Sequence, residues 1–178
     1  MGQKVNPIGL RLALNKNWSS HWFARKDNKN NFGDWLHEDL KIRSYIKKNF
    51  NNAAISKILV ERYGTRVRVT IYAARPGILI GRKGAELDAL KASVSKLLAQ
   101  GEELILDVVE IKQPETNAQL VAESVAQQLE RRIGFRRAMK KAIQVAMELG
   151  AEGIKIHCAG RLGGAELART EQYKEGRT

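Results

Sequence analysis

Two glycines that flank two cations form the most specific motif of this sequence. The residues are Gly81, Arg82, Lys83 and Gly84, and they follow an apolar stretch at 78–80. Because glycine lacks a Cβ, such a turn lets another chain approach its backbone, and the free amides of a helix start favour negative charge. Backbone phosphates of a single nucleic-acid strand fit this chemistry. Taken alone the motif is weak, because a helix end at Gly81 and a helix start at Gly84 would produce the same residues.

The elements predicted around the motif make it more specific. The predicted elements, in chain order, are a helix at 34–49, strands at 55–61 and 66–72, helices at 76–80 and 85–98, and a strand at 104–111. A Gly-x-x-Gly turn between two helices in this α-β-β-α-α-β order is the KH module in its bacterial, type II arrangement, whose loop clamps about four nucleotides of RNA backbone. The dinucleotide and nucleoside-triphosphate glycine motifs are both absent from the sequence, so no cofactor is expected.

A second concentration of positive charge lies at and before a predicted helix, 135–149. Its members are Arg131, Arg132, Arg136, Arg137, Lys140 and Lys141. Helical spacing puts Arg137 and Lys141 opposite the apolar residues Met139 and Ile143, and the sequence has no acidic residue between 130 and 148. Solvated helix faces normally mix both signs of charge, so this acid-free surface favours RNA contact over simple solvation.

The fold class is α+β, and the chain divides into three predicted parts. They are an N-terminal extended arm at 1–33, a KH domain at 34–112 and a second α+β domain at 113–178. Pro114 marks the last boundary, because the residue before a proline is pushed out of the helical region. The second domain is predicted to contain helices at 118–134 and 135–149 and a β-hairpin with strands at 154–159 and 166–173.

The net charge of the chain indicates which class of partner it binds. The 178 residues include 31 Lys and Arg against 19 Asp and Glu, which gives a net charge of +12. Such an excess is typical of chains that neutralise phosphates. No apolar run approaches the ~20 residues of a membrane span, and the start lacks the apolar stretch of a signal peptide. We therefore expect a cytoplasmic protein whose partner is a polyanion and not a membrane.

The sequence offers no catalytic or metal-binding constellation. Cys158 is the single cysteine, and His21, His37 and His157 lack the close spacing of a zinc site. In a strand, His157 and Cys158 point to opposite faces, so they cannot act together as base and nucleophile, and Cys158 is predicted to be buried.

Two features have alternative interpretations. The arm residues Trp18, Trp22 and Phe23 suit stacking on bases and docking on the protein's own core equally well. The glycine-rich segment 160–164 is explained by tight-turn chemistry better than by contact with a phosphate.

Four segments of the sequence resemble the bacterial family of small-subunit ribosomal protein three. They are MGQKVNPIGLRL at the start, ARPGILIGRKG in the middle, QLERRIGFRRAMKKAIQ in the second domain and GRLGGAELARTEQYKEGR at the end. The resemblance implies a structural constituent of the small ribosomal subunit, not an enzyme, that binds ribosomal RNA in the head of the subunit. It also implies that the chain lines the pore through which messenger RNA enters, near small-subunit proteins four and five, with proteins ten and fourteen as further neighbours.

The resemblance also points to individual residues. The family's Phe-Arg-Arg-Ala-Met-Lys motif, which helps the ribosome open structured messenger, matches residues 135–140 and so points to Arg136, Arg137 and Lys140. Family members usually continue past the Glu-Gly-Arg found at 175–177, so we expect the natural protein to be longer. A tryptophan usual in the family is Gln172 here. The alternatives are a free-standing KH regulator of particular messengers and an enzyme that acts on nucleic acid.

Overall fold

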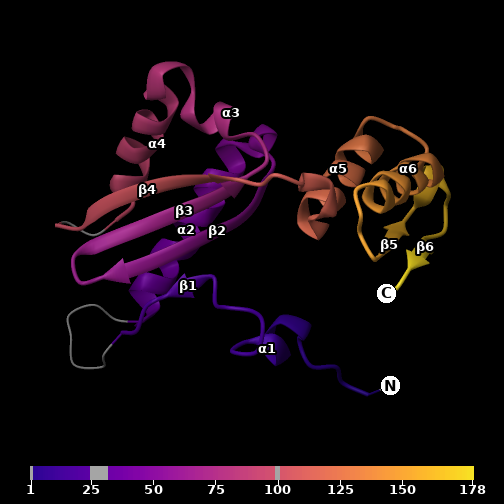
Figure 1. Cartoon of the computed structure of the whole chain (residues 1–178), viewed down its shortest axis with the longest axis horizontal. Helices are drawn as coiled ribbons and strands as arrows, with labels where there is room; N and C mark the ends of the chain where they lie inside the picture. The colour runs from indigo at the N-terminus through magenta and orange to yellow at the C-terminus, as the bar shows by residue number, and fades with distance from the viewer. Residues whose placement is uncertain (1, 25–31, 99–100) are drawn as a thin grey trace. The chain divides into compact units, whose positions relative to one another are not determined.

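The chain folds into two compact units, residues 1–109 and 110–178, which we describe separately. The computed structural model describes residues 2–24, 32–98 and 101–178 (Figure 1). Both units combine helices with a β-sheet, as the predicted α+β class requires. In the described ranges, no helix has both the length and the apolar character needed to cross a membrane.

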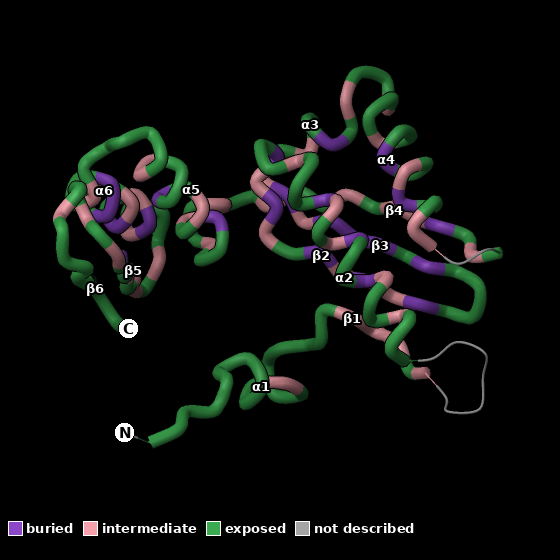
Figure 2. The backbone as a smooth tube through the Cα atoms, turned by 180° about the vertical axis from the view of Figure 1, so that it is seen from behind, coloured by how far each residue is buried: buried purple, intermediate pink, exposed green. Residues whose placement is uncertain are grey.

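The first unit contains the predicted α-β-β-α-α-β order. Its elements are α2 (Phe32–Asn49), β2 (Ile55–Tyr63), β3 (Arg66–Ala73), α3 (Pro76–Ile80), α4 (Ala85–Ser95) and β4 (Glu103–Glu110). Strands β2 and β3 are antiparallel, and the sheet order is β1-β2-β3-β4. The helices contribute Ile42, Ile46, Leu79, Leu90 and Val94 to one core, which packs on the valines and isoleucines of β2 and β3. Figure 2 shows in purple where these helices and strands have buried segments.

The apolar pattern of strand β4 predicts cover on both faces, and this prediction is wrong for one face. Leu104 is buried, and Leu106 and Val108 pack against the core, but Ile105 is only partly buried and Val109 is 40% exposed. The reason is that the core of this unit lies on one face of the sheet only. Every second side chain along β4 therefore points away from that core.

The N-terminal arm is less extended than predicted. It contains the short helix α1 (Pro7–Arg11), capped by the Asn6 side chain, and the two-residue strand β1 (Ser20–His21), which pairs in parallel with β2. Trp22 docks on the protein itself: its ring lies 5.4 Å from that of Trp35. Trp18 and Phe23 are largely exposed. Residues 25–31 of the predicted arm lie outside the described residues.

A buried ion cluster fastens the arm to the first unit. Asp39 is fully buried on α2 and accepts hydrogen bonds from Ser20 Oγ at 2.8 Å, Trp22 Nε1 at 2.9 Å and Arg62 Nη2 at 3.0 Å. Arg62 also contacts the carboxylates of Glu38 and Glu102 at 2.9 and 3.3 Å. Burial raises the pKa of Glu102, and the Arg62 charge opposes that rise.

The second unit packs two helices on a β-hairpin. Its elements are α5 (Ala118–Glu130), capped by Asn117, α6 (Phe135–Glu148), β5 (Gly153–Gly160) and β6 (Arg169–Gly176). Val125, Ala138, Met139 and Cys158 form the buried centre. Strand β6 begins at 169, later than the predicted 166, because residues 161–168 all belong to the connection between the strands.

Candidate nucleic-acid interface

The Gly81–Gly84 turn lies at the tip of the α3–α4 pair (Figure 1). The buried Leu79 anchors α3 beneath the turn, while Arg82 and Lys83 are both exposed. Gly84 occupies the N-cap of α4, and none of the described side chains caps the amides there. The turn therefore offers both ammonium and guanidinium charge and the uncapped start of a helix, as a phosphate-binding loop requires.

Gly81 is required by close packing as well as by backbone conformation. Its φ of 68° lies in the left-handed region, and its amide donates to the Gly77 carbonyl at 2.9 Å, which ends α3. A Cβ at this position would overlap Cγ and Cβ of Glu86 in the first turn of α4. Gly81 thus ends α3 and also lets the chain turn tightly into α4. The interpretation of the motif as a helix boundary is therefore compatible with its interpretation as a phosphate-binding turn.

Two acidic residues lie beside the turn, and the sequence motif alone does not point to them. Glu86 and Asp88 belong to the first turn of α4 and are exposed. They stabilise the helix start through its dipole, but they also repel a phosphate chain. The electrostatic field at the turn is therefore mixed, with Arg82 and Lys83 attracting a phosphate and Glu86 and Asp88 opposing it.

All six cations of the second cluster are exposed. Helix α6 buries Ala138, Met139, Ile143 and Ala146, which leaves Arg137 and Lys141 on the opposite face, as predicted. Arg131 ends α5, and Arg132 lies in the turn between the two helices. One compact turn-helix segment therefore carries the whole cluster.

One member of the cluster has an acidic partner that the local sequence does not reveal. Arg136 Nη2 lies 3.9 Å from Glu171 Oε1 on β6, and its guanidinium lies over the Phe135 ring at 5.6 Å from the centroid. The prediction of an acid-free surface is therefore wrong at Arg136, because folding brings an acid of a distant strand beside it. Across residues 2–24, 32–98 and 101–178, the other five cations form no ion pair.

Arg132 holds an unusual backbone conformation. Its φ is 60°, and the hydrogen bonds from Arg132 N to Leu129 O and from Ile133 N to Gln128 O close the end of α5. Glycine is the residue that this position favours, because a Cβ in the left-handed region costs about 1–2 kcal/mol. Lys83 in the first cluster has the same feature, with φ of 55°. Such outliers concentrate at functional sites.

We expect Arg132→Gly to be more stable than Arg132→Ala by about 0.5–1 kcal/mol. Glycine removes the strain of the left-handed conformation, and this gain exceeds the conformational entropy that glycine loses on folding. Both variants lose the same charge, so both should bind single-stranded RNA equally weakly. Urea unfolding and RNA titration of the two variants measure the two effects. A glycine variant less stable than the alanine variant would show that the arginine conformation is not strained.

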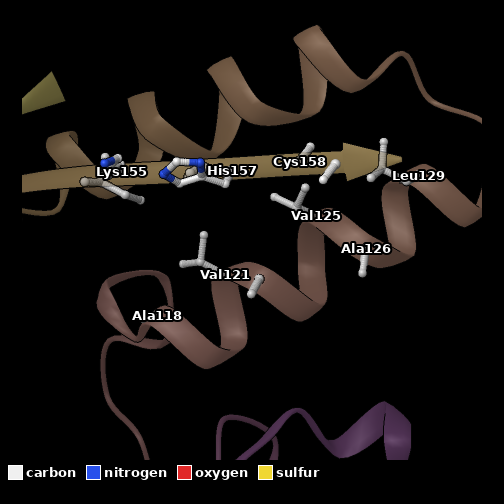
Figure 3. Close-up of a pocket in the computed structure, with 12 residues that line it drawn as sticks. Ala118, Val121, Val125, Ala126, Leu129, Lys155, His157 and Cys158 are labelled. Carbon is white, nitrogen blue, oxygen red and sulfur yellow. The ribbon is translucent and has the colours of Figure 1, made fainter. Parts of the chain in front are cut away.

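The apolar groove between α5 and β5 carries no reactive pair among the described residues (Figure 3). It has a volume of about 350 Å³ and is lined by residues that include Val121, Val125 and Leu129 of α5. Cys158 is buried there, as predicted, and burial raises the pKa of its thiol, which disfavours the reactive thiolate. The neighbouring His157 is exposed. In the described part of the chain, no group of three or more His, Cys, Asp or Glu side chains is placed to hold a metal ion.

Comparisons with known proteins agree with this geometry. A family model described as "KH domain" matches residues 41–116, and one described as "Ribosomal protein S3, C-terminal domain" matches residues 125–178. The two clusters of exposed cations fall one in each matched region. The structure thus places the Gly-x-x-Gly turn between helices of a KH domain.

Curated relatives match almost the whole chain. The small ribosomal subunit protein uS3 of Beijerinckia indica is 57% identical over 99% of this chain and 71% of the relative. The proteins of the same name from Caulobacter vibrioides and Akkermansia muciniphila are 58% and 55% identical, with 69% and 76% of their lengths covered. At this identity and coverage, the chain belongs to the family of small ribosomal subunit protein uS3, as its four sequence motifs indicated.

Proposed function

We propose that the chain is a structural, RNA-binding constituent of the small ribosomal subunit that acts in translation and has no enzymatic role. The observation that carries this proposal is the pair of exposed cationic turns, each of which holds a cation, Lys83 or Arg132, in a strained left-handed conformation. Strain at an exposed charge favours a role in binding, because stability alone would select glycine at both positions. The names of the relatives supply the ribosome as the place of that binding.

The two cationic surfaces have different proposed partners. The Gly81–Gly84 turn, in a KH domain at 34–112, binds ribosomal RNA in the head of the subunit. The surface of Arg131, Arg132, Arg136, Arg137, Lys140 and Lys141, in the domain at 113–178, faces incoming messenger RNA. Small-subunit proteins ten and fourteen are the proposed neighbours, with proteins four and five near the messenger pore, and the assembled particle is cytoplasmic.

Replacing Arg136, Arg137 and Lys140 with Ala should slow translation through a stable hairpin far more than through an unstructured message. We expect the three side chains to contact the phosphates of the messenger and none of its bases. Each contact with a single-strand phosphate contributes ~0.7 to the slope of log affinity against log salt concentration. Loss of all three contacts should therefore lower that slope by about 2. Folding should survive, because the substituted side chains are exposed and Ala favours helix. The measurement is translation by reconstituted ribosomes on paired templates that differ only in hairpin stability.

A matched control separates this role from a general loss of charge. Lys41→Ala, Lys91→Ala and Lys96→Ala remove three exposed cations from α2, α4 and the C-cap of α4 in the first unit, and they should leave hairpin templates unaffected. Both triple variants should co-sediment with small subunits in sucrose gradients. Equal slowing on both templates by the α6 variant would mean that this surface contacts ribosomal RNA and not messenger.

A further inference from the structure

The outward face of the β5–β6 hairpin is a third cationic surface, and it sets two lysines directly opposite each other. The antiparallel register pairs Lys155 with Lys174, His157 with Gln172 and Ala159 with Thr170. All six of these residues are exposed. Their neighbours Ile156, Cys158 and Tyr173 pack into the core of the unit, so the six alternate residues lie on the opposite face of the hairpin, where Lys155, His157 and Ala159 also border the α5–β5 groove.

The lysine pair is unfavourable in the free protein. Residues directly opposite on one face of an antiparallel pair have Cβ atoms about 4.5–5.5 Å apart, and like charges there destabilise the sheet. In the described ranges, neither ammonium forms an ion pair. The nearby acid Glu171 belongs to the inward side of the hairpin, where Arg136 and Arg169 contact it. Among the six residues of the outward face, none is acidic.

Charge complementarity identifies the class of ligand. An anion between Lys155 and Lys174 would offset their repulsion, and repeated anions would extend past them to the hydrogen-bonding side chains of His157, Gln172 and Thr170. A phosphodiester backbone supplies repeated anions and ribose hydroxyls at this scale. The six residues of the face include no large apolar side chain that would mark it for an apolar protein partner.

We propose that the outward face of the β5–β6 hairpin is a further RNA-backbone site, in which Lys155 and Lys174 together hold consecutive phosphates. Because α6 packs on the inward side of the same hairpin, the second unit then contacts RNA on two opposed surfaces. The inference rests on the proposed RNA-binding function and extends it to a face for which the sequence motifs predicted no RNA contact.

Lys174→Glu tests the site, because it should move stability and affinity in opposite directions. A carboxylate at position 174, opposite Lys155, replaces repulsion by attraction, so the urea midpoint of the chain should rise. The same substitution neutralises both cations toward RNA, so the affinity for a uridine dodecamer should fall about tenfold and the salt slope by about 1.4, the value for two single-strand phosphates. Lys155→Glu should behave alike, and Lys174→Arg should keep the parent affinity.

Lysine acetylation tests whether RNA covers these two residues and whether another polyanion does the same. Acetylation of Lys155 and Lys174, followed by mass spectrometry, should slow about threefold or more when the dodecamer is bound, and polyglutamate should give no such protection. Lys41→Glu, the same charge change on α2, controls for net charge. An affinity unchanged by Lys174→Glu, or protection by polyglutamate alone, would overturn the proposal. The α6 triple variant, titrated in parallel, reports on the proposed function, because its loss of affinity does not depend on the hairpin face.

Discussion

The chain in which Arg82 and Lys83 are both replaced by Asp should bind single-stranded RNA at least about thirtyfold more weakly than the parent. Each exposed cation contributes about 1 kcal/mol to an ionic contact, and a loss of about 2 kcal/mol corresponds to that factor. Reversal of charge adds repulsion, because Glu86 and Asp88 already lie beside the turn. The salt dependence of binding should also fall by about 1.4 in slope.

Folding should be unaffected by the same substitution. Both side chains are exposed, and the left-handed conformation of Lys83 suits Asp, which tolerates it better than most residues do. A control with Lys41→Asp and Lys91→Asp makes the same change of charge on exposed helical positions of the same unit. Titration of both variants with a uridine oligomer measures their RNA affinity, and thermal unfolding measures their stability. Equal affinities of the two variants would reduce the Gly81–Gly84 turn to a connection between helices.

The course of the chain is predictable where apolar residues follow a single period. The strands predicted at 55–61 and 66–72 lie within β2 and β3, and the helix predicted at 135–149 is α6 to within one residue. In these elements the pattern that drives burial is also the pattern that the sequence displays. Short pieces held by tertiary contacts, such as α1 and β1, have no period, so no local pattern predicts them.

The buried ion cluster could have been found from charge and period together. Asp39 falls on the helical stripe of Trp35, Ile42 and Ile46, and Arg62 continues the inward alternation of β2. A charge on a buried stripe requires a partner of opposite sign, so the coincidence of one acid and one base predicts their contact. The apolar residues of the helix and the strand do not by themselves predict the contact between Asp39 and Arg62.

Backbone and tertiary details of the candidate sites could not be predicted. The left-handed conformations of Lys83 and Arg132 depend on how the turn is closed, and residue type argues against them. The Arg136–Glu171 contact exists because β6 lies beside the start of α6, which no local pattern encodes. These features set the backbone geometry and the ion pairing of the cations that we propose contact RNA.

Asp39→Ala is expected to destabilise the first unit by about 3–5 kcal/mol, more than any other substitution proposed for this chain. The side chain is fully buried, and its removal takes from the 2%-exposed Arg62 side chain the most deeply buried of its three carboxylate partners. Ser20 and Trp22 lose their acceptor as well, so β1 should separate from β2. Urea unfolding gives the stability, and tryptophan fluorescence reports the release of Trp22.

An exposed ion pair should contribute much less to stability than the buried Asp39 cluster. Asp107 lies 3.5 Å from Arg68, with both side chains about half exposed, so Asp107→Ala should cost about 0.2–1 kcal/mol. Asp39→Asn keeps the shape and two acceptor lone pairs while it removes the charge, and it should fall between the two alanine variants. If Asp39→Ala cost no more than Asp107→Ala, the Asp39 cluster would not be what holds the arm. RNA binding by the α6 surface should be unchanged in all three variants, because that surface belongs to the second unit.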